Sequence, residues 1–169
     1  DLGSNYRMTE MQAAIGREQL KSLDKQIKKR NLIANLYLNG LKDYYLKYDI
    51  LKKPNLKFQT YPQKQNLKKS NQYIHAFYRL NLFINKNKIK QNNLIQQLNK
   101  NKINCGVGSC AEIYREKIFK KLKFYPKKRL LNAKLLGETS IMFPINPYKA
   151  LTKIKSEISS IKRILNNYL

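Results

Sequence analysis

The spacing of apolar residues predicts a long helix near the start of the chain. Thr9 is followed three residues later by Gln12, which is typical of a capping box, so a helix is expected to begin there. Apolar residues then share one face, first at Met11, Ala14 and Ile15 and afterwards at steps of three, four and seven at Leu20, Leu23, Ile27, Ala34, Leu38 and Leu41. Residues 10–41 are interpreted as one long or kinked helix that ends near Gly40 and exposes Lys25, Lys28, Lys29 and Arg30.

A second pattern, in YIHAFYRLNLFI at residues 73–84, alternates with a period of two and predicts a strand. Its apolar inner face is expected to comprise Ile74, Ala76, Tyr78, Leu80, Leu82 and Ile84. The opposite, mixed face is expected to comprise His75, Phe77, Arg79, Asn81 and Phe83.

The remaining segments predict short helices and strands in alternation. Residues 50–72, with Pro54 and Pro62, indicate an exposed loop or short edge strand. Helices are predicted within 88–101, 111–122 and 129–138, and strands at 103–109, which runs into a glycine-bearing turn, and at 139–145. A terminal amphipathic helix is predicted from a Thr152 cap, with Ile154, Ile158, Ile161 and Leu165 inward. Together these elements predict an α/β or α+β layer structure.

Composition and charge change this picture little. The formal net charge is +25, but the Lys residues are scattered over nearly every segment together with Asn, Ile and Tyr, as an AT-rich genome would impose on surface positions. A solvated Lys surface is therefore favoured over a specific nucleic-acid site, and a basic nucleic-acid-binding module stays open as an alternative. With no apolar run long enough to span a membrane and no secretory signal, we expect a cytoplasmic protein.

The candidate chemistry is sparse. Cys105 and Cys110 have only His75 to join them, which is too few ligands for structural zinc, so reduced and partly buried thiols are expected. His75 on a strand face is more typical of a packing histidine than of a catalyst. The segment Asn5-Tyr6-Arg7 is different, because an amide and a guanidinium directly before a capped helix can donate hydrogen bonds to a phosphate or carboxylate.

A family resemblance supports an anion site in this segment. GSNYRMTEMQAAIGREQLKSLD at residues 3–24 resembles a long signature of the DegT/DnrJ/StrS family of pyridoxal-phosphate-dependent nucleotide-sugar aminotransferases. HAFYRLNLFI, INCGVGSCAEIYREKIF and LLGETSIMFPINP resemble, in order, the C-terminal part of one branch of that family. The resemblance implies the C-terminal portion of a fold-type-I enzyme, with residues 1–41 as the end of the large domain and its connecting helix and residues 42–169 as the small domain.

The resemblance also assigns roles to residues. Asn5 is expected to bind the phosphate of pyridoxal phosphate across a homodimer interface. Arg7, also assigned to cofactor binding, is expected to hold an anionic group nearby or to brace the loop, and Tyr6 and His75 are expected to bind the substrate. The family's Schiff-base lysine lies in an S-[FY]-x-x-x-K segment upstream of N-Y-R-M, and no such segment occurs here. No lysine of this chain is therefore assigned to catalysis, and the chain by itself is expected to be inactive. Where many members have a His- and Pro-rich loop near the sugar, this chain has CGVGSCAEIY, so the sugar-contacting residues stay open.

The implied reaction transfers an amino group, usually from glutamate, to a keto sugar carried on a nucleotide, in the biosynthesis of cell-surface polysaccharides or deoxyamino sugars. The chain begins Asp-Leu-Gly, as expected for a piece of a longer enzyme. A dehydratase or a regulator with the same fold stays open as an alternative.

Overall fold

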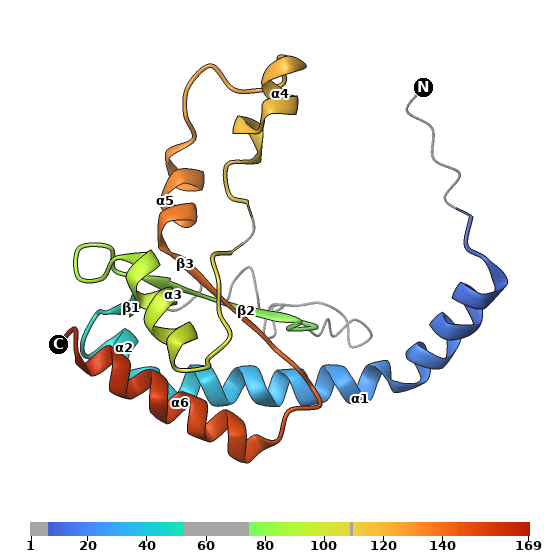
Figure 1. Ribbon diagram of the computed structural model, residues 1–169, viewed down its shortest axis with the longest axis horizontal. Helices are drawn as coiled ribbons and strands as arrows, with labels where there is room; N and C mark the ends of the chain where they lie inside the picture. Colours follow the sequence, from blue (N-terminus) through green and yellow to red (C-terminus); the bar gives the residue numbers. More distant parts are fainter. Residues whose placement is uncertain (1–6, 53–74, 109) are drawn as a thin grey trace, which may run out of the picture.

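The computed structural model describes residues 7–52, 75–108 and 110–169 of the chain (Figure 1). The chain begins with helices α1 (Glu10–Gly40) and α2 (Lys42–Leu46), which lead to strands β1 (Leu51–Lys52) and β2 (Arg79–Ile84). Helix α3 (Gln91–Lys100) follows, and then the 3₁₀ turn η1 (Ile113–Arg115), α4 (Lys117–Lys121) and α5 (Leu131–Thr139). Strand β3 (Ser140–Pro144) and the terminal helix α6 (Leu151–Asn166) complete the fold.

The long first helix begins where the sequence predicted. The Gln12 amide donates to Thr9 Oγ1 at 3.3 Å and the Thr9 amide donates to Gln12 Oε1 at 3.0 Å, which completes the capping box. Only its second half is covered, however, since its buried residues are Ile33, Ala34, Tyr37 and Leu38. Met11 is 78% exposed, and Ile15, Leu20 and Leu23 are exposed as well, because the first half of α1 projects away from the rest of the described structure (Figure 1).

Helices α1 and α6 lie side by side and share the core (Figure 1). The predicted inward positions Ile154, Ile158, Ile161 and Leu165 of α6 are all buried. Gly40 ends α1 as predicted, and its missing side chain has a second role: a Cβ at this position would lie 2.6 Å from Ile158 Cγ2. The Thr152 cap is wrong, because α6 begins at Leu151 after Ala150, and Ala150 has no side-chain oxygen to accept from the first amides.

The sheet has three antiparallel strands in the order β1-β2-β3. In its register Leu80 faces Phe143 and Leu82 faces Ile141, and these pairs point into the core together with Ile84. The predicted strand is shorter than expected, and its inner face is wrong at the beginning: Phe77 is 3% exposed whereas Tyr78 is 61% exposed and Ala76 is also exposed. Phe77 has a φ of 42°, a left-handed conformation that breaks the alternation before β2 begins.

The predicted strand at 103–109 is replaced by a single bridge. Gly106 and Met142 exchange backbone hydrogen bonds of 3.0 and 2.8 Å, and the chain then leaves the sheet. Residues 113–129, which we call the basic arm, include η1 and α4 and rise away from the sheet on the side opposite α6 (Figure 1). Most of the predicted 50–72 loop, together with the beginning of the 73–84 strand, lies outside the described residues.

Helices therefore flank a small antiparallel sheet, which confirms the predicted α+β layer structure. In the described ranges, no helix combines the length and the apolarity needed to cross a bilayer.

Candidate functional site

Arg7 is the described part of the predicted anion site, and Asn5 and Tyr6 lie outside the described residues. It is exposed and stands two residues before Thr9, the N-cap of α1. The first four amides of a helix have no partner within it, and the capping box uses those of Thr9 and Gln12. The amides of Glu10 and Met11, with the Arg7 guanidinium, are thus the available donors for a phosphate, although the Glu10 carboxylate opposes an anion there.

His75 is held against the middle of α1, in a different place. Its backbone carbonyl accepts a hydrogen bond from Asn31 Nδ2 at 2.7 Å, and its Nδ1 accepts one from the Phe77 amide at 2.9 Å. Its ring also packs on the Phe77 ring, with 4.2 Å between centroids. Burial lowers the pKa of His75, so the imidazole is neutral near pH 7, and Nε2 carries the proton because Nδ1 is an acceptor.

The structure therefore does not bring Arg7 and His75 together within one chain. Arg7 precedes the first turn of α1, whereas His75 contacts Asn31, and at 1.5 Å per residue roughly 30 Å of helix separates the two levels. A single site that used both residues would need a second chain.

Lysine is the residue type that could bind a carbonyl compound covalently, but this requires a desolvated amine. Over residues 7–52, 75–108 and 110–169 no lysine is buried. Lys149 is among the half-buried ones, and its Nζ is engaged in an ion pair 2.5 Å from Glu157 Oε1.

The Lys149–Glu157 pair is part of a buried cluster that the sequence analysis missed. Tyr37 on α1 donates its hydroxyl to Glu157 Oε2 at 2.9 Å, and Tyr37 also packs on Phe143 of β3. Burial and the hydrogen bond to Glu157 both raise the pKa of Tyr37, so the phenol stays protonated. A signal was available, because Glu157 interrupts the apolar face of α6 beside Ile158. The cluster joins α1, α6 and the loop before α6, and its role is to hold them together.

A second polar cluster missed by the sequence analysis closes the basic arm at its base. Arg129 donates from Nε and Nη2 to the two carboxylate oxygens of Glu112, at 2.7 and 2.6 Å. The Tyr114 hydroxyl donates to Glu112 at 2.7 Å and accepts from the Leu130 amide at 3.1 Å. The Arg129 hydrogen bonds, assisted by Tyr114, lower the pKa of Glu112 to about 2, so the carboxylate stays charged at neutral pH. These contacts join the two ends of the arm.

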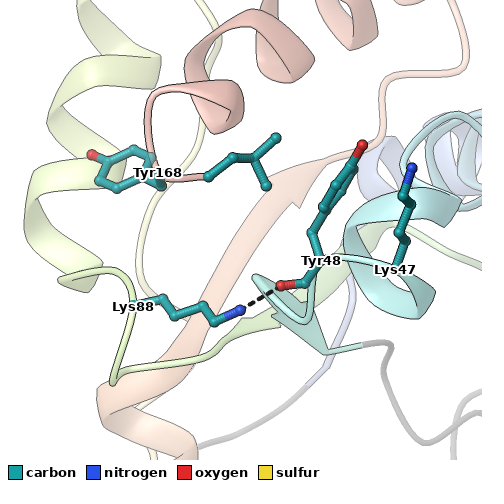
Figure 2. A pocket seen from close by; sticks show the side chains of 5 residues that line it. Lys47, Tyr48, Lys88 and Tyr168 are labelled. Atoms are coloured by element: carbon teal, nitrogen blue, oxygen red, sulfur yellow. Dashed lines mark hydrogen bonds between the residues drawn. The ribbon is translucent and has the colours of Figure 1, made fainter.

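A pocket of about 440 Å³ lies near the end of the described chain, lined by Lys47, Tyr48, Lys88, Tyr168 and Leu169 (Figure 2). Lys88 Nζ donates to the Tyr48 carbonyl at 2.7 Å, and the Tyr168 hydroxyl points away from Lys88 (Figure 2). None of the residues predicted from the sequence lines this pocket, and its lysines are not arranged around a common point. We assign no chemistry to it.

The two thiols differ in their surroundings. Cys105 is buried beside α3, and burial raises its pKa to about 11, which keeps it a neutral thiol. Cys110 is exposed at the base of the arm, with its Sγ 3.6 Å from Glu116 Oε1. The prediction of partly buried thiols is thus confirmed for Cys105 and wrong for Cys110, because the chain leaves the sheet between them.

Known proteins are similar to this chain in both sequence and arrangement of elements. Residues 1–162 match the DegT/DnrJ/EryC1/StrS aminotransferase family. An aminotransferase from Psychrobacter cryohalolentis is 31% identical, with a TM-score of 0.82 over 99% of this chain. An uncharacterised protein from Methanocaldococcus jannaschii is 26% identical over 166 residues, which are 98% of this chain. The chain spans 41% of the length of the first and 39% of the second.

The E. coli GDP-4-keto-6-deoxy-D-mannose-3-dehydratase, solved with bound hydrated pyridoxal phosphate, has a TM-score of 0.69 over 95% of this chain and 37% of its own. At 20% identity this likeness shows the fold alone. The family match, by contrast, extends from the segment before α1 through most of α6. This chain therefore belongs to the DegT/DnrJ/EryC1/StrS aminotransferase family, and its fold is that of the C-terminal portion of such enzymes.

Proposed function

We propose that this chain is part of a cytoplasmic, homodimeric, pyridoxal-phosphate-dependent aminotransferase that moves an amino group from glutamate to a keto sugar carried on a nucleotide. The observation that carries the proposal is the similarity to the Psychrobacter aminotransferase, 31% identical over 99% of this chain. We further propose residues 1–41 as the end of a large domain with its connecting helix and residues 42–169 as the small domain. The break between α1 and α2 at Leu41 supports this boundary.

The described residues fit one part of the cofactor, its phosphate. Arg7 supplies a guanidinium, and the amides of Glu10 and Met11 supply further donors beside it. Asn5 adds an amide donor in the same segment. When bound, pyridoxal phosphate supplies an electron sink for the amino-transfer chemistry. Among the described residues no buried lysine can bind the cofactor covalently, so in the proposal this chain binds and orients the phosphate only.

For the substrate we propose Tyr6 and His75. The neutral imidazole of His75 offers an Nε2–H donor, and its orientation is maintained by the Phe77 amide on Nδ1 and by Asn31 on the carbonyl. These contacts suit a residue that positions a sugar oxygen rather than one that transfers protons, because protonation would break the bond to Phe77.

The distance along α1 between Arg7 and His75 supports a site formed by two subunits. If Arg7 and Asn5 bind the phosphate in a neighbouring subunit, the exposed apolar residues of the first half of α1 would be covered there as well. Each active site would then combine the N-terminal segment of one chain with the small domain of the other.

The test uses the longer enzyme that contains this chain. Asn5→Ala and Arg7→Gln should each weaken retention of pyridoxal phosphate about ten- to hundredfold, since a charge-assisted hydrogen bond contributes about 1.5–3 kcal/mol. Arg17→Gln, which changes an exposed arginine within α1, is the control and should leave retention unchanged. Cofactor absorbance after desalting measures the result, and equal losses at Arg7 and Arg17 would contradict the assignment.

Mixed dimers test the cross-subunit role. Chains with Asn5→Ala, combined with chains that lack the covalent lysine, should regain one intact site per heterodimer, with turnover as the readout. Confirmed heterodimers that stay as inactive as either parent would refute it.

A dehydratase is the second candidate, favoured by the shared fold of the E. coli enzyme. Product analysis separates the two: an aminotransferase forms an amino sugar and consumes glutamate stoichiometrically, whereas a dehydratase releases water and leaves no nitrogen on the sugar.

A further inference from the structure

The basic arm contains the densest group of cations in the described structure. Residues 113–129 include one carboxylate, Glu116, and eight cations: Arg115, Lys117, Lys120, Lys121, Lys123, Lys127, Lys128 and Arg129. Arg115 and Arg129 pair with Glu112, whereas no carboxylate of the described ranges lies within 4.0 Å of the arm's six lysines. The arm therefore presents lysines that are free to bind an anion.

These lysines are ordered by a short helix. Lys117, Lys120 and Lys121 on α4 follow steps of three and four, so they lie on one side of the helix. Lys123 then adopts a left-handed conformation, with a φ of 57°, and the Phe124 amide donates back to the Phe119 carbonyl at 2.9 Å. This turn ends α4 and places two aromatic residues directly after the lysines.

The aromatic residues are exposed to solvent. Phe124 is 71% exposed and Tyr125 is 53% exposed, and neither belongs to the buried core. Adjacent rings and lysines are the combination that proteins use to hold a nucleotide, because a base stacks on a ring while ammonium groups pair with its phosphates.

The arm is also a defined structure rather than a free tail. Its ends are joined by the bidentate Arg129–Glu112 pair and by Tyr114, which contacts both Glu112 and Leu130. The arm extends away from the sheet on the side opposite α6 (Figure 1).

We propose that the basic arm binds the nucleoside diphosphate group of the substrate, with Lys117, Lys120 and Lys121 on the phosphates and Phe124 or Tyr125 stacked on the base. The inference rests on the proposed function, because that function supplies a substrate with this group. It is favoured over a simple phosphate site by the rings, and over an extended nucleic-acid site by the small size of the arm.

Calorimetric titration of this chain at low ionic strength tests the proposal, with uridine diphosphate, guanosine diphosphate, inorganic pyrophosphate and a single-stranded oligonucleotide as probes. One variant, the arm triple, replaces Lys117, Lys120 and Lys121 with Gln and so removes three positive charges. A second variant, the control triple, replaces Lys25, Lys28 and Lys42 with Gln and so removes three positive charges from exposed positions of α1 and α2. A third variant combines Phe124→Leu with Tyr125→Leu.

At least one nucleotide should bind the unmodified chain. The arm triple should lower the affinity for that nucleotide roughly tenfold or more, while the control triple should change the affinity less than about twofold. The aromatic variant should lower the affinity for the nucleotide about tenfold and leave the affinity for pyrophosphate unchanged, because only the nucleotide has a base that can stack on a ring. Unaltered far-UV circular dichroism confirms that the exposed substitutions leave the fold intact.

Several outcomes would overturn the inference: no nucleotide binding, equal losses in both triples, no effect of the aromatic variant, or much tighter binding of a single-stranded oligonucleotide. None of these readouts involves pyridoxal phosphate or turnover. If the longer enzyme transfers amino groups but its arm does not bind a nucleotide, this inference alone is refuted. If the arm binds a nucleotide but the longer enzyme does not transfer amino groups, only the proposed function is refuted.

Discussion

The close packing of α1 on α6 at Gly40 leads to a prediction in which two identical substitutions in one helix have opposite effects. At Gly40 a new Cβ would lie 2.6 Å from Ile158 Cγ2 and 3.4 Å from Ile158 Cδ1. At Gly16, in the projecting half of the same helix, no described atom outside the surrounding helix lies within 4 Å of the new Cβ. The chemical change is the same, and only the tertiary surroundings differ.

The magnitudes follow from these distances. Replacing glycine by alanine inside a helix stabilises it by about 0.5–1 kcal/mol, and Gly16→Ala should gain up to this amount. At Gly40 the contact is too short for real Cβ atoms, and Ile158 Cγ2 is attached directly to a branched Cβ, so it cannot rotate aside cheaply. Overpacking of this kind costs about 1–3 kcal/mol, so after the helix gain is subtracted Gly40→Ala should be less stable than the parent by up to about 2.5 kcal/mol.

Urea and thermal unfolding, followed by far-UV circular dichroism at low protein concentration, measure both effects. A change of 1 kcal/mol shifts Tm by about 2–4 °C in a chain of this size. Ile158→Ala removes the opposing Cγ2, and in that background the overpacking cost of Gly40→Ala should disappear, giving a coupling energy of about 1–3 kcal/mol. If Gly40→Ala is as stabilising as Gly16→Ala, or if the two changes at 40 and 158 are additive, the close approach of α1 and α6 is wrong.

Three further predictions concern reactivity, pH and association. At pH 8, Cys110 should react rapidly with a thiol reagent, whereas Cys105, with its thiol pKa raised to about 11, should react only on unfolding; similar rates would contradict its burial. The pKa of Glu112 is lowered from 4.5 to about 2, so its contacts stabilise the arm above pH 4.5 and are lost as the pH falls toward 2. This acid transition should appear in the NMR chemical shifts of the arm and should be absent from the Glu112→Gln variant. The chain should self-associate through the exposed half of α1. The double variant Met11→Glu, Ile15→Glu should weaken this association at least tenfold, as measured by sedimentation velocity, since burying each apolar side chain contributes about 1.5–3 kcal/mol. Unchanged association would exclude this surface.

Several elements could be predicted because their causes are local. The capping box of Thr9 and Gln12 involves residues three apart, and the spacing of Ile154, Ile158 and Ile161 determines one helical face. The alternation of Leu80 and Leu82 likewise assigns one face of β2 to the core. In each case a short window of sequence contains both the residues and their period.

The errors occur where distant contacts decide the outcome. Alternation alone assigns Phe77 outward, but a left-handed turn before β2 buries it beside His75. The period of α1 does not say which half of the helix will be covered, because coverage depends on α6, more than a hundred residues later in the chain. For the same reason the apolar positions Met11 and Ile15 are helical, as predicted, and still exposed.

For the candidate site, the sequence by itself determined the residue types and the family: Arg7 before a capped helix, and a long signature around it. Only the tertiary structure decided that Arg7 and His75 lie at different levels of α1, that Tyr37 and Glu157 meet although 120 residues separate them, and that Arg129 joins Glu112 to close the basic arm. The physical reason is the range of the interactions. Capping and periodic burial act within a few residues, whereas the pairing of a buried carboxylate or a cation depends on which segments the packed core brings together.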